Sequence, residues 1–251
     1  MTYSACLRRR FWTVLLLLVV AGVGSNHLRS LAQDAPVDRC LTFSGNGQYV
    51  FVPHGMELNS FPFTIAFWLK TTQTNPFVGI ATKYLTGAGN GWDVHLNNGF
   101  VRSYYFKTWS DRLWTGDTAQ DRPNGGFVAD GRWHHIAYTV DASGGRFYVD
   151  GEMTDHLPWT GAAGAPSHTM ELILGGTRVD KTTEIDGHFV GSLDDLRIWN
   201  RAIDGIGVRQ LMAGAHTSQD PVLHFDFDQD VGPILTNRAA TGARFQGELR
   251  G

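Results

Sequence analysis

The segment DGRWHHIAYTVDASGGRFYVDG, residues 130–151, decides the fold of this chain. Its first part, residues 133–140, is rich in aromatic and β-branched side chains, which favour β-strands. Residues 141–145 read Asp-Ala-Ser-Gly-Gly, and these residue types reverse a chain readily because Gly adopts positive φ while Asp and Ser hydrogen-bond to nearby backbone. Residues 147–149 return as a second strand, and residues 150–151 form a further turn. The segment therefore predicts a β-hairpin.

The rest of the chain is also typical of an all-β protein. The segment FTIAFWLK at 63–70 alternates strictly between its two faces, as a half-buried strand does. The segment GSLDDLRIWNRAI at 191–203 contains another strand. Thirty Gly and frequent turn signals fit a sandwich or barrel. One short helix is expected at 203–213, where two internal Gly weaken it. Further strands are predicted within 41–53, 79–84, 91–96, 100–106, 171–175 and 221–228.

Four segments, together with the 191–203 strand, resemble the LamG-like jellyroll domains of the concanavalin A-like lectin and glucanase superfamily. They are FSGNGQYV at 43–50, FTIAFW at 63–68, WHHIA at 133–137 and FYVDG at 147–151. The resemblance implies an all-β fold, an antiparallel two-sheet β-sandwich of the jellyroll type. It implies no single function, because lectins, hydrolases and adhesion modules share this fold.

Residues 1–32 are predicted to be a signal peptide. A basic start precedes an apolar core at 11–24 and a small-residue cleavage site, Ser-Leu-Ala, at 30–32. The apolar core is short for a transmembrane helix, which needs about 20 apolar residues; an uncleaved anchor is the alternative. Residues 33–251 then form one LamG-like jellyroll domain, with 219–251 as its closing segment. We expect a secreted or exported protein with no membrane span after cleavage.

Charge and cysteine content narrow the range of partners. Residues 1–32 contain four Arg and no acidic residue, so their removal lowers the net charge from −3 to −7. An acidic chain is not suited to non-specific nucleic-acid binding, which needs a basic surface. Because Cys6 leaves with the signal peptide, Cys40 is predicted to have no intramolecular partner. Cys40 is then a small buried residue or, as the alternative, forms an intermolecular disulfide.

The sequence lacks the residue pairs that hydrolysis or zinc binding would need. Glucanases of this superfamily carry a Glu-x-Asp-x-x-Glu strand, whereas no two Glu of residues 33–251 lie within five positions of each other. Asp194 and Asp195 are adjacent, so on a strand they point to opposite faces, and the same holds for His134 and His135. We therefore predict a protein that is not an enzyme. A glycoside hydrolase with unrecognised carboxylates is kept as an alternative.

Calcium is the only cofactor that the sequence suggests. In glucanases of the superfamily, an Asp of a late strand holds a structural ion with backbone oxygens near the first strands, and Asp194 and Gly45 occupy those positions. Pentraxins hold calcium between two loops, which correspond to 81–90 and 174–186 but lack the pentraxin acidic pattern. The alternatives are backbone hydrogen bonds by the Asp and solvated loops. The candidate calcium ligands are Asp180, Glu184, Asp186 and Asp194, because calcium prefers oxygen ligands.

Aromatic residues are concentrated between positions 92 and 114. Sugar rings stack on aromatic faces while polar side chains bind their hydroxyls, so such a cluster favours a glycan site. Strand alternation places Trp92 and His95 on different faces, so about half of these rings must be core. Residues 107–127 are predicted to be a long loop, a length that is usually functional; a loop that buries its own tryptophans is the alternative. The candidate ligand-binding residues are Asn90, Trp92, Trp109, Arg112 and Trp114.

These observations predict a secreted, non-catalytic recognition module. It would bind an extracellular glycan or a glycosylated surface through the loops around 84–92, 107–127 and 176–188. The second interpretation is a structural or adhesion module that binds protein partners.

Overall fold

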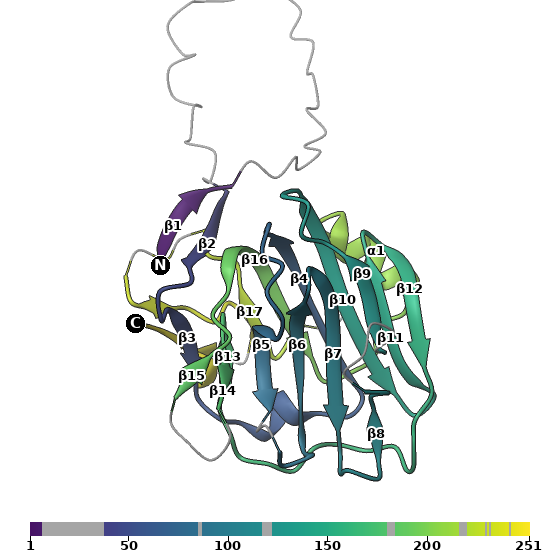
Figure 1. Cartoon of the computed structure of the whole chain (residues 1–251). Helices are drawn as coiled ribbons and strands as arrows, with labels where there is room; N and C mark the ends of the chain where they lie inside the picture. Colours follow the sequence, from purple (N-terminus) through teal and green to yellow (C-terminus); the bar gives the residue numbers. More distant parts are fainter. Residues whose placement is uncertain are drawn as a thin grey trace, which may run out of the picture.

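The computed structural model describes residues 1–6, 38–84, 87–116, 122–179, 184–215, 220–228, 230, 232–240 and 242–251. Within these ranges the chain forms two large antiparallel sheets packed face to face and one short α-helix (Figure 1). Side chains from both sheets meet in a common core, to which Phe63 and Ile136 contribute from one sheet and Trp92 and Leu174 from the other. The two-sheet β-sandwich that the sequence predicts is therefore confirmed.

The first sheet, which we call the helix sheet, carries α1 (Gly205–Met212) against its outer face through Val208 and Leu211. Asp204 caps α1, because its carboxylate accepts a hydrogen bond from the Gly207 N–H at 2.8 Å. The strand order is β1-β2-β16-β4-β10-β11-β12, with β17 also paired to β16. The strands are β1 (Thr2–Ala5), β2 (Arg39–Ser44), β4 (Phe63–Lys70), β10 (Trp133–Asp141), β11 (Gly144–Val149), β12 (Glu152–Leu157), β16 (Val190–Trp199) and β17 (Leu223–Phe225).

The second sheet, which we call the cavity sheet, has the order β18-β19-β3-β13-β5-β6-β7-β8, with β9 also paired to β7. A two-stranded sheet of β14 (Thr177–Arg178) and β15 (Ile185–Asp186) lies beside β5, and two short 3₁₀ helices occupy Met56–Asn59 and Gly242–Phe245. The strands of the cavity sheet are β3 (Tyr49–Val52), β5 (Val78–Tyr84), β6 (Gly91–Asn97), β7 (Phe100–Phe106), β8 (Arg112–Leu113), β9 (Asn124–Phe127), β13 (Leu172–Leu174), β18 (Ile234–Leu235) and β19 (Gly247–Arg250).

The region 107–127, predicted to be one long loop, is instead tied to the sheet at both ends. β8 pairs with the end of β7, and β9 pairs with its beginning. These strands were missed because two to four residues are too few to show a periodic pattern. Residues 117–121 lie outside the described ranges. The strand β12 was missed as well, because its alternate residues are mostly exposed and carry no apolar pattern.

The C-terminal segment contributes strands to both sheets. β17 pairs with β16 in the helix sheet, and β19 pairs with β3 in the cavity sheet. Every second residue from 223 to 227 points inward, because Leu223, Phe225 and Phe227 are fully buried in the common core. The segment thus adds to the same sandwich.

The paired histidines of the decisive hairpin have separate environments, as strand alternation predicts. The His134 ring lies between two carboxylates, with Nε2 3.0 Å from Asp130 Oδ1 and Nδ1 2.8 Å from Asp150 Oδ2. The hydrogen bond to Asp150, and then that to Asp130, raise the pKa of His134 above its ordinary value. His135 is buried and packs edge-on against Trp68. Because the two rings point apart, they do not form one metal site.

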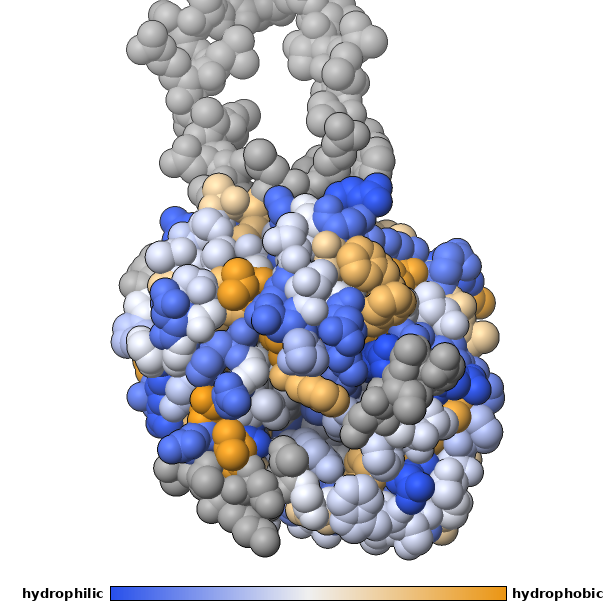
Figure 2. Space-filling view, viewed as in Figure 1, coloured by the Kyte–Doolittle hydropathy of each residue, from blue (hydrophilic) through white to orange (hydrophobic). Residues whose placement is uncertain are grey.

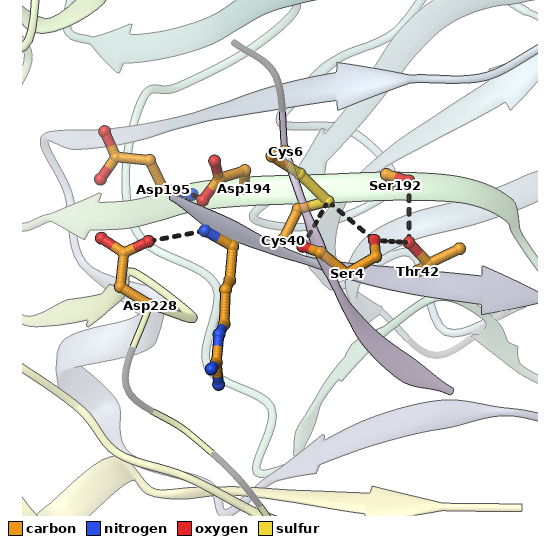
Figure 3. Close-up of a disulfide and its surroundings, with 9 residues drawn as sticks. Ser4, Cys6, Cys40, Thr42, Ser192, Asp194, Asp195 and Asp228 are labelled. Atoms are coloured by element: carbon orange, nitrogen blue, oxygen red, sulfur yellow. Dashed lines mark hydrogen bonds between the residues drawn. A yellow bond between two sulfur atoms is a disulfide. The ribbon is translucent and has the colours of Figure 1, made fainter. Parts of the chain in front are cut away.

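The prediction that Cys40 has no intramolecular partner is wrong for the chain as the structure describes it. Cys6 and Cys40 form a disulfide (Figure 3). The cause is β1, which pairs with β2 and places residues 2–5 at the edge of the helix sheet. A chain of hydroxyl groups follows the pairing, since Ser4 Oγ and Thr42 Oγ1 lie 3.0 Å apart. The prediction assumed that Cys6 leaves with the predicted signal peptide, whose apolar core and cleavage site lie outside the described residues.

In the part of the chain that the structure describes, no helix combines the length and the apolar character needed to cross a bilayer.

Candidate functional site

The outer face of the cavity sheet carries the site, and strand alternation puts its side chains there. On β6, Trp92 points into the core, whereas Asp93 and His95 point outward. On β7, Tyr105 points into the core, whereas Tyr104 points outward. Asp93 and Tyr104 are direct cross-strand partners. The predicted division of these rings between core and surface is therefore confirmed.

Outward side chains and neighbouring loops enclose a cavity of about 280 Å³. The three loops expected to bind a ligand meet here, because Gly87, Trp109 and Thr177 come one from each. In the space-filling view, hydrophobic side chains form small groups among hydrophilic ones (Figure 2). The cavity is lined by Phe77, Gly79, Tyr84, Gly87, Asp93, His95, Tyr104, Phe106, Trp109, Trp114 and Thr177.

Most of the cavity wall consists of aromatic rings in mutual contact. The ring of Phe106 lies 5.2 Å from that of Trp109 and 5.5 Å from that of Trp114, measured between centroids. Tyr104 connects this group to His95, with centroids 4.5 Å apart. Phe77 stacks on the other side of His95 at 6.2 Å. Because each ring packs against its neighbours, the wall presents flat apolar surfaces.

Asp93 and His95 supply polar side chains of the cavity. The Asp93 Oδ1 atom accepts a hydrogen bond from the Tyr104 N–H at 2.8 Å and lies 3.1 Å from His95 Nδ1. Both side chains are buried. The carboxylate thus fixes the orientation of the imidazole within the wall.

Trp109 projects from a turn that is anchored at several points. The Asp111 N–H donates to the Thr108 carbonyl oxygen at 3.2 Å, and Asp111 Oδ1 accepts from the Ala162 N–H at 2.7 Å. This Ala162 hydrogen bond, followed by the contact with Lys107, lowers the pKa of Asp111. The Trp109 ring is 48 % exposed. A half-exposed indole on a fixed turn is suited to stacking on a ligand.

Gly89 makes room for the Trp109 ring. It has a φ of +57°, and a Cβ atom there would lie 2.5 Å from the indole. A side chain at this position would displace the ring.

Two of the predicted ligand-binding residues have other roles. Trp92 is fully buried, and its Nε1 donates to the Leu58 carbonyl oxygen at 2.7 Å, so its ring has no surface to offer a ligand. The side-chain amide of Asn90 stabilises the neighbouring loop, because its Oδ1 accepts hydrogen bonds from the backbone N–H groups of Ser167 and His168, each at 2.9 Å. The interpretation of Trp92 as a ligand contact is therefore wrong, whereas that of the partly exposed Asn90 stays a prediction.

The other predicted residues lie at the cavity or next to it. Trp109 and Trp114 line it. Arg112 lies behind the wall, with its guanidinium 5.6 Å from the Trp114 ring and a hydrogen bond to the Trp109 carbonyl oxygen. Sequence reasoning missed Phe77, Asp93 and Phe106, which no local pattern marks as cavity residues. Tyr84 and Thr177 were predicted only as members of the loops around 84–92 and 176–188.

The predicted calcium ligands lie in different surroundings, and calcium binding stays a prediction. Within the described ranges no three His, Cys, Asp or Glu side chains converge, whereas calcium also takes backbone oxygens among its six to eight ligands. Asp194 is fully buried in β16, where its Oδ1 accepts from the Asp195 N–H at 2.6 Å. Glu184 and Asp186 are exposed near the two-stranded sheet. Asp180 lies outside the described residues.

Comparisons with known proteins agree with this fold. A family model described as "Concanavalin A-like lectin/glucanases superfamily", of the laminin G type, matches residues 44–205. The match covers more than half of the chain, so the chain belongs to this superfamily.

Two curated relatives match part of the chain. A protein of Rattus norvegicus, "Sushi, von Willebrand factor type A, EGF and pentraxin domain-containing protein 1", is 27 % identical over 68 % of this chain. Human neuronal pentraxin-2 is 30 % identical over 57 % of this chain. The matched regions span 5 % and 32 % of those two proteins.

Two solved structures share the fold. A putative carbohydrate binding protein from Bacteroides ovatus has a TM-score of 0.60 and 16 % identity, covering 84 % of this chain and 58 % of that chain. The binding domain of botulinum neurotoxin DC, solved with rat synaptotagmin II, has a TM-score of 0.51 and 14 % identity, covering 83 % and 55 %.

Proposed function

We propose that this domain is a non-catalytic carbohydrate-binding module and that the aromatic cavity is its binding site. The wall of connected rings with the half-exposed Trp109 carries the proposal. The C–H faces of sugars stack on aromatic rings, and a few polar groups then fix the orientation of the sugar. Asp93 and His95 are polar groups of that kind.

The size of the cavity supports recognition of one sugar unit. Its volume of about 280 Å³ lies at the lower end of ligand pockets, which hold roughly 300–1,000 Å³. A single pyranose ring suits this space better than several consecutive units. We therefore infer that the domain recognises the terminal or side-branch residue of a glycan.

The charged groups of the cavity support binding without hydrolysis. Glycosidases of the usual type need two carboxyl groups roughly 5–9.5 Å apart on either side of the bond. Asp93 is the single carboxylate among the described residues that line the cavity. It is occupied by the Tyr104 N–H and His95. The likeness to the Bacteroides ovatus structure supports the fold on which such a module is built.

The test is glycan-array binding by the purified chain, followed by affinity measurements on the best sugar. Replacing Trp109 by Ala should cost about 1–3 kcal/mol of binding free energy, by analogy with aromatic stacking of bases. Phe127→Ala is the matched control, because Phe127 is 50 % exposed on the same sheet and does not line the cavity.

Equal binding by the two variants would reject the cavity as the site. An array without any signal, combined with capture of a protein partner, would favour the adhesion module.

A further inference from the structure

Two buried polar atoms in the cavity wall have no hydrogen-bond partner among the described residues. They are Nε2 of His95 and Nε1 of Trp114. His95 is only 3 % exposed. Buried polar atoms in folded proteins are nearly always paired, and each exception needs an explanation. Both atoms belong to residues that line the cavity, so a bound ligand is a natural partner for them.

The two atoms have opposite hydrogen-bonding roles. With its proton on Nδ1, where it can be donated to the Asp93 carboxylate 3.1 Å away, the His95 ring has Nε2 as an acceptor. Trp114 Nε1–H can only donate. Both rings contact Tyr104, with centroids 4.5 Å and 5.9 Å from the Tyr104 ring. The wall therefore offers an acceptor and a donor, each on a ring in contact with Tyr104.

Each unpaired atom belongs to a ring beside an exposed aromatic residue. Phe77, 46 % exposed, stacks on His95, and the half-exposed Trp109 packs against Trp114 with centroids 6.3 Å apart. Phe77 and Trp109 are thus the exposed members of the wall, and a ligand that displaces them gains access to the two rings against which they pack.

We propose that His95 Nε2 and Trp114 Nε1 select a hydroxyl-bearing ring as the ligand. This inference rests on the proposed function and names the groups that give it specificity. A hydroxyl both donates and accepts, so the hydroxyls of one pyranoside satisfy both atoms while its C–H face contacts the rings. A quaternary ammonium ion suits an aromatic cage, but it has neither a donor nor an acceptor and would leave both atoms unpaired.

The test uses the full chain and its tryptophan fluorescence, titrated with methyl α- and β-pyranosides of glucose, galactose and mannose. Tetrahydropyran serves as the same ring without hydroxyls, and tetramethylammonium as the cation. We expect saturable changes with at least one pyranoside and none with the two control compounds. Saturation by tetrahydropyran or tetramethylammonium at the same concentrations as the pyranosides would overturn the inference.

Matched variants then locate the effect. In His95→Asn the amide can still donate to Asp93, but no polar atom remains at the Nε2 position. In His95→Gln a polar atom remains near the Nε2 position. We expect about tenfold weaker pyranoside binding by His95→Asn and by Trp114→Phe, the loss of one hydrogen bond each, and a smaller change for His95→Gln. Circular dichroism checks the fold of each variant. If His95→Asn does not fold, the pyranoside affinity of Trp114→Phe alone tests the inference.

The outcomes separate the two proposals. If no pyranoside binds and the glycan array is blank, the proposed function fails, and this inference fails with it. If pyranosides bind and Trp109→Ala weakens them, but His95→Asn and Trp114→Phe bind as the unmodified chain does, the proposed function stands and the selection by these two atoms is refuted.

Discussion

Lys83 gives a prediction that can be worked out in detail. It lies on β5 and is fully buried. Its Nζ atom is 3.0 Å from His54 Nδ1 and also donates to the Met170 carbonyl oxygen. Burial lowers the pKa of Lys83 from 10.5 to about 7. The pKa of neighbouring His168 falls to about 4 through burial and then the charge of Lys83. The folded chain therefore disfavours the charged amine.

The sign of the effect follows from proton binding. Above pH 7 the folded state binds fewer protons at Lys83 than the unfolded state does, so the free energy of unfolding rises with pH. Each pKa unit corresponds to about 1.4 kcal/mol. With the pKa of Lys83 near 7 in the folded state, the gain between pH 7 and pH 9 is about 2 kcal/mol. Replacing Lys83 by Met removes this gain.

Urea unfolding at pH 7 and pH 9, followed by circular dichroism, measures the effect. The unmodified chain should gain about 2 kcal/mol relative to Lys83→Met between the two pH values. Lys70→Met is the control, because Lys70 is exposed at the end of β4 and its removal should leave the pH dependence unchanged. A difference between the unmodified chain and Lys83→Met that stays constant with pH would refute the reasoning.

Three further predictions concern separate parts of the molecule. Asp150 and Asp130 raise the pKa of His134. The stabilisation by protonated His134 is therefore complete below the unfolded pKa of about 6.5 and is lost as pH rises through the folded pKa. In thermal unfolding, His134→Gln should gain less stability than the unmodified chain on going from pH 8 to pH 6, and an identical pH response of the two proteins would contradict this. If the signal peptide is cleaved as predicted, the denatured unreduced protein should react with one equivalent of iodoacetamide at Cys40; a chain that keeps the Cys6 disulfide should show no reactive thiol. If calcium binds at Asp194, which is buried in β16, a calcium chelator should lower the melting temperature and added calcium should restore it; a melting temperature that does not change with chelator would contradict this prediction.

The strands were predictable where their residues alternate or form apolar runs. β4 and β7 have the bounds that the pattern at 63–70 and 100–106 predicts. The same alternation places Trp92 in the core and His95 outside it. Local side-chain periodicity is a property of the sequence itself, so no tertiary information was needed.

The composition of the cavity could not be predicted in the same way. Tyr104 faces Asp93 because of the pairing of β6 with β7, and Phe77 reaches His95 from the turn before β5. Asn90 is occupied by the backbone of residues 167–168. Such contacts depend on strand register and on loops distant in sequence, and neither follows from residue types alone.

The claim that the rings of the cavity hold a sugar is tested most directly by nuclear Overhauser contacts between the protein and the best-binding pyranoside. We predict contacts from the indole protons of Trp109 and Trp114 to the C–H protons of one sugar face. A sugar that binds but contacts only rings outside the cavity, such as Phe100 and Phe127, would contradict the account.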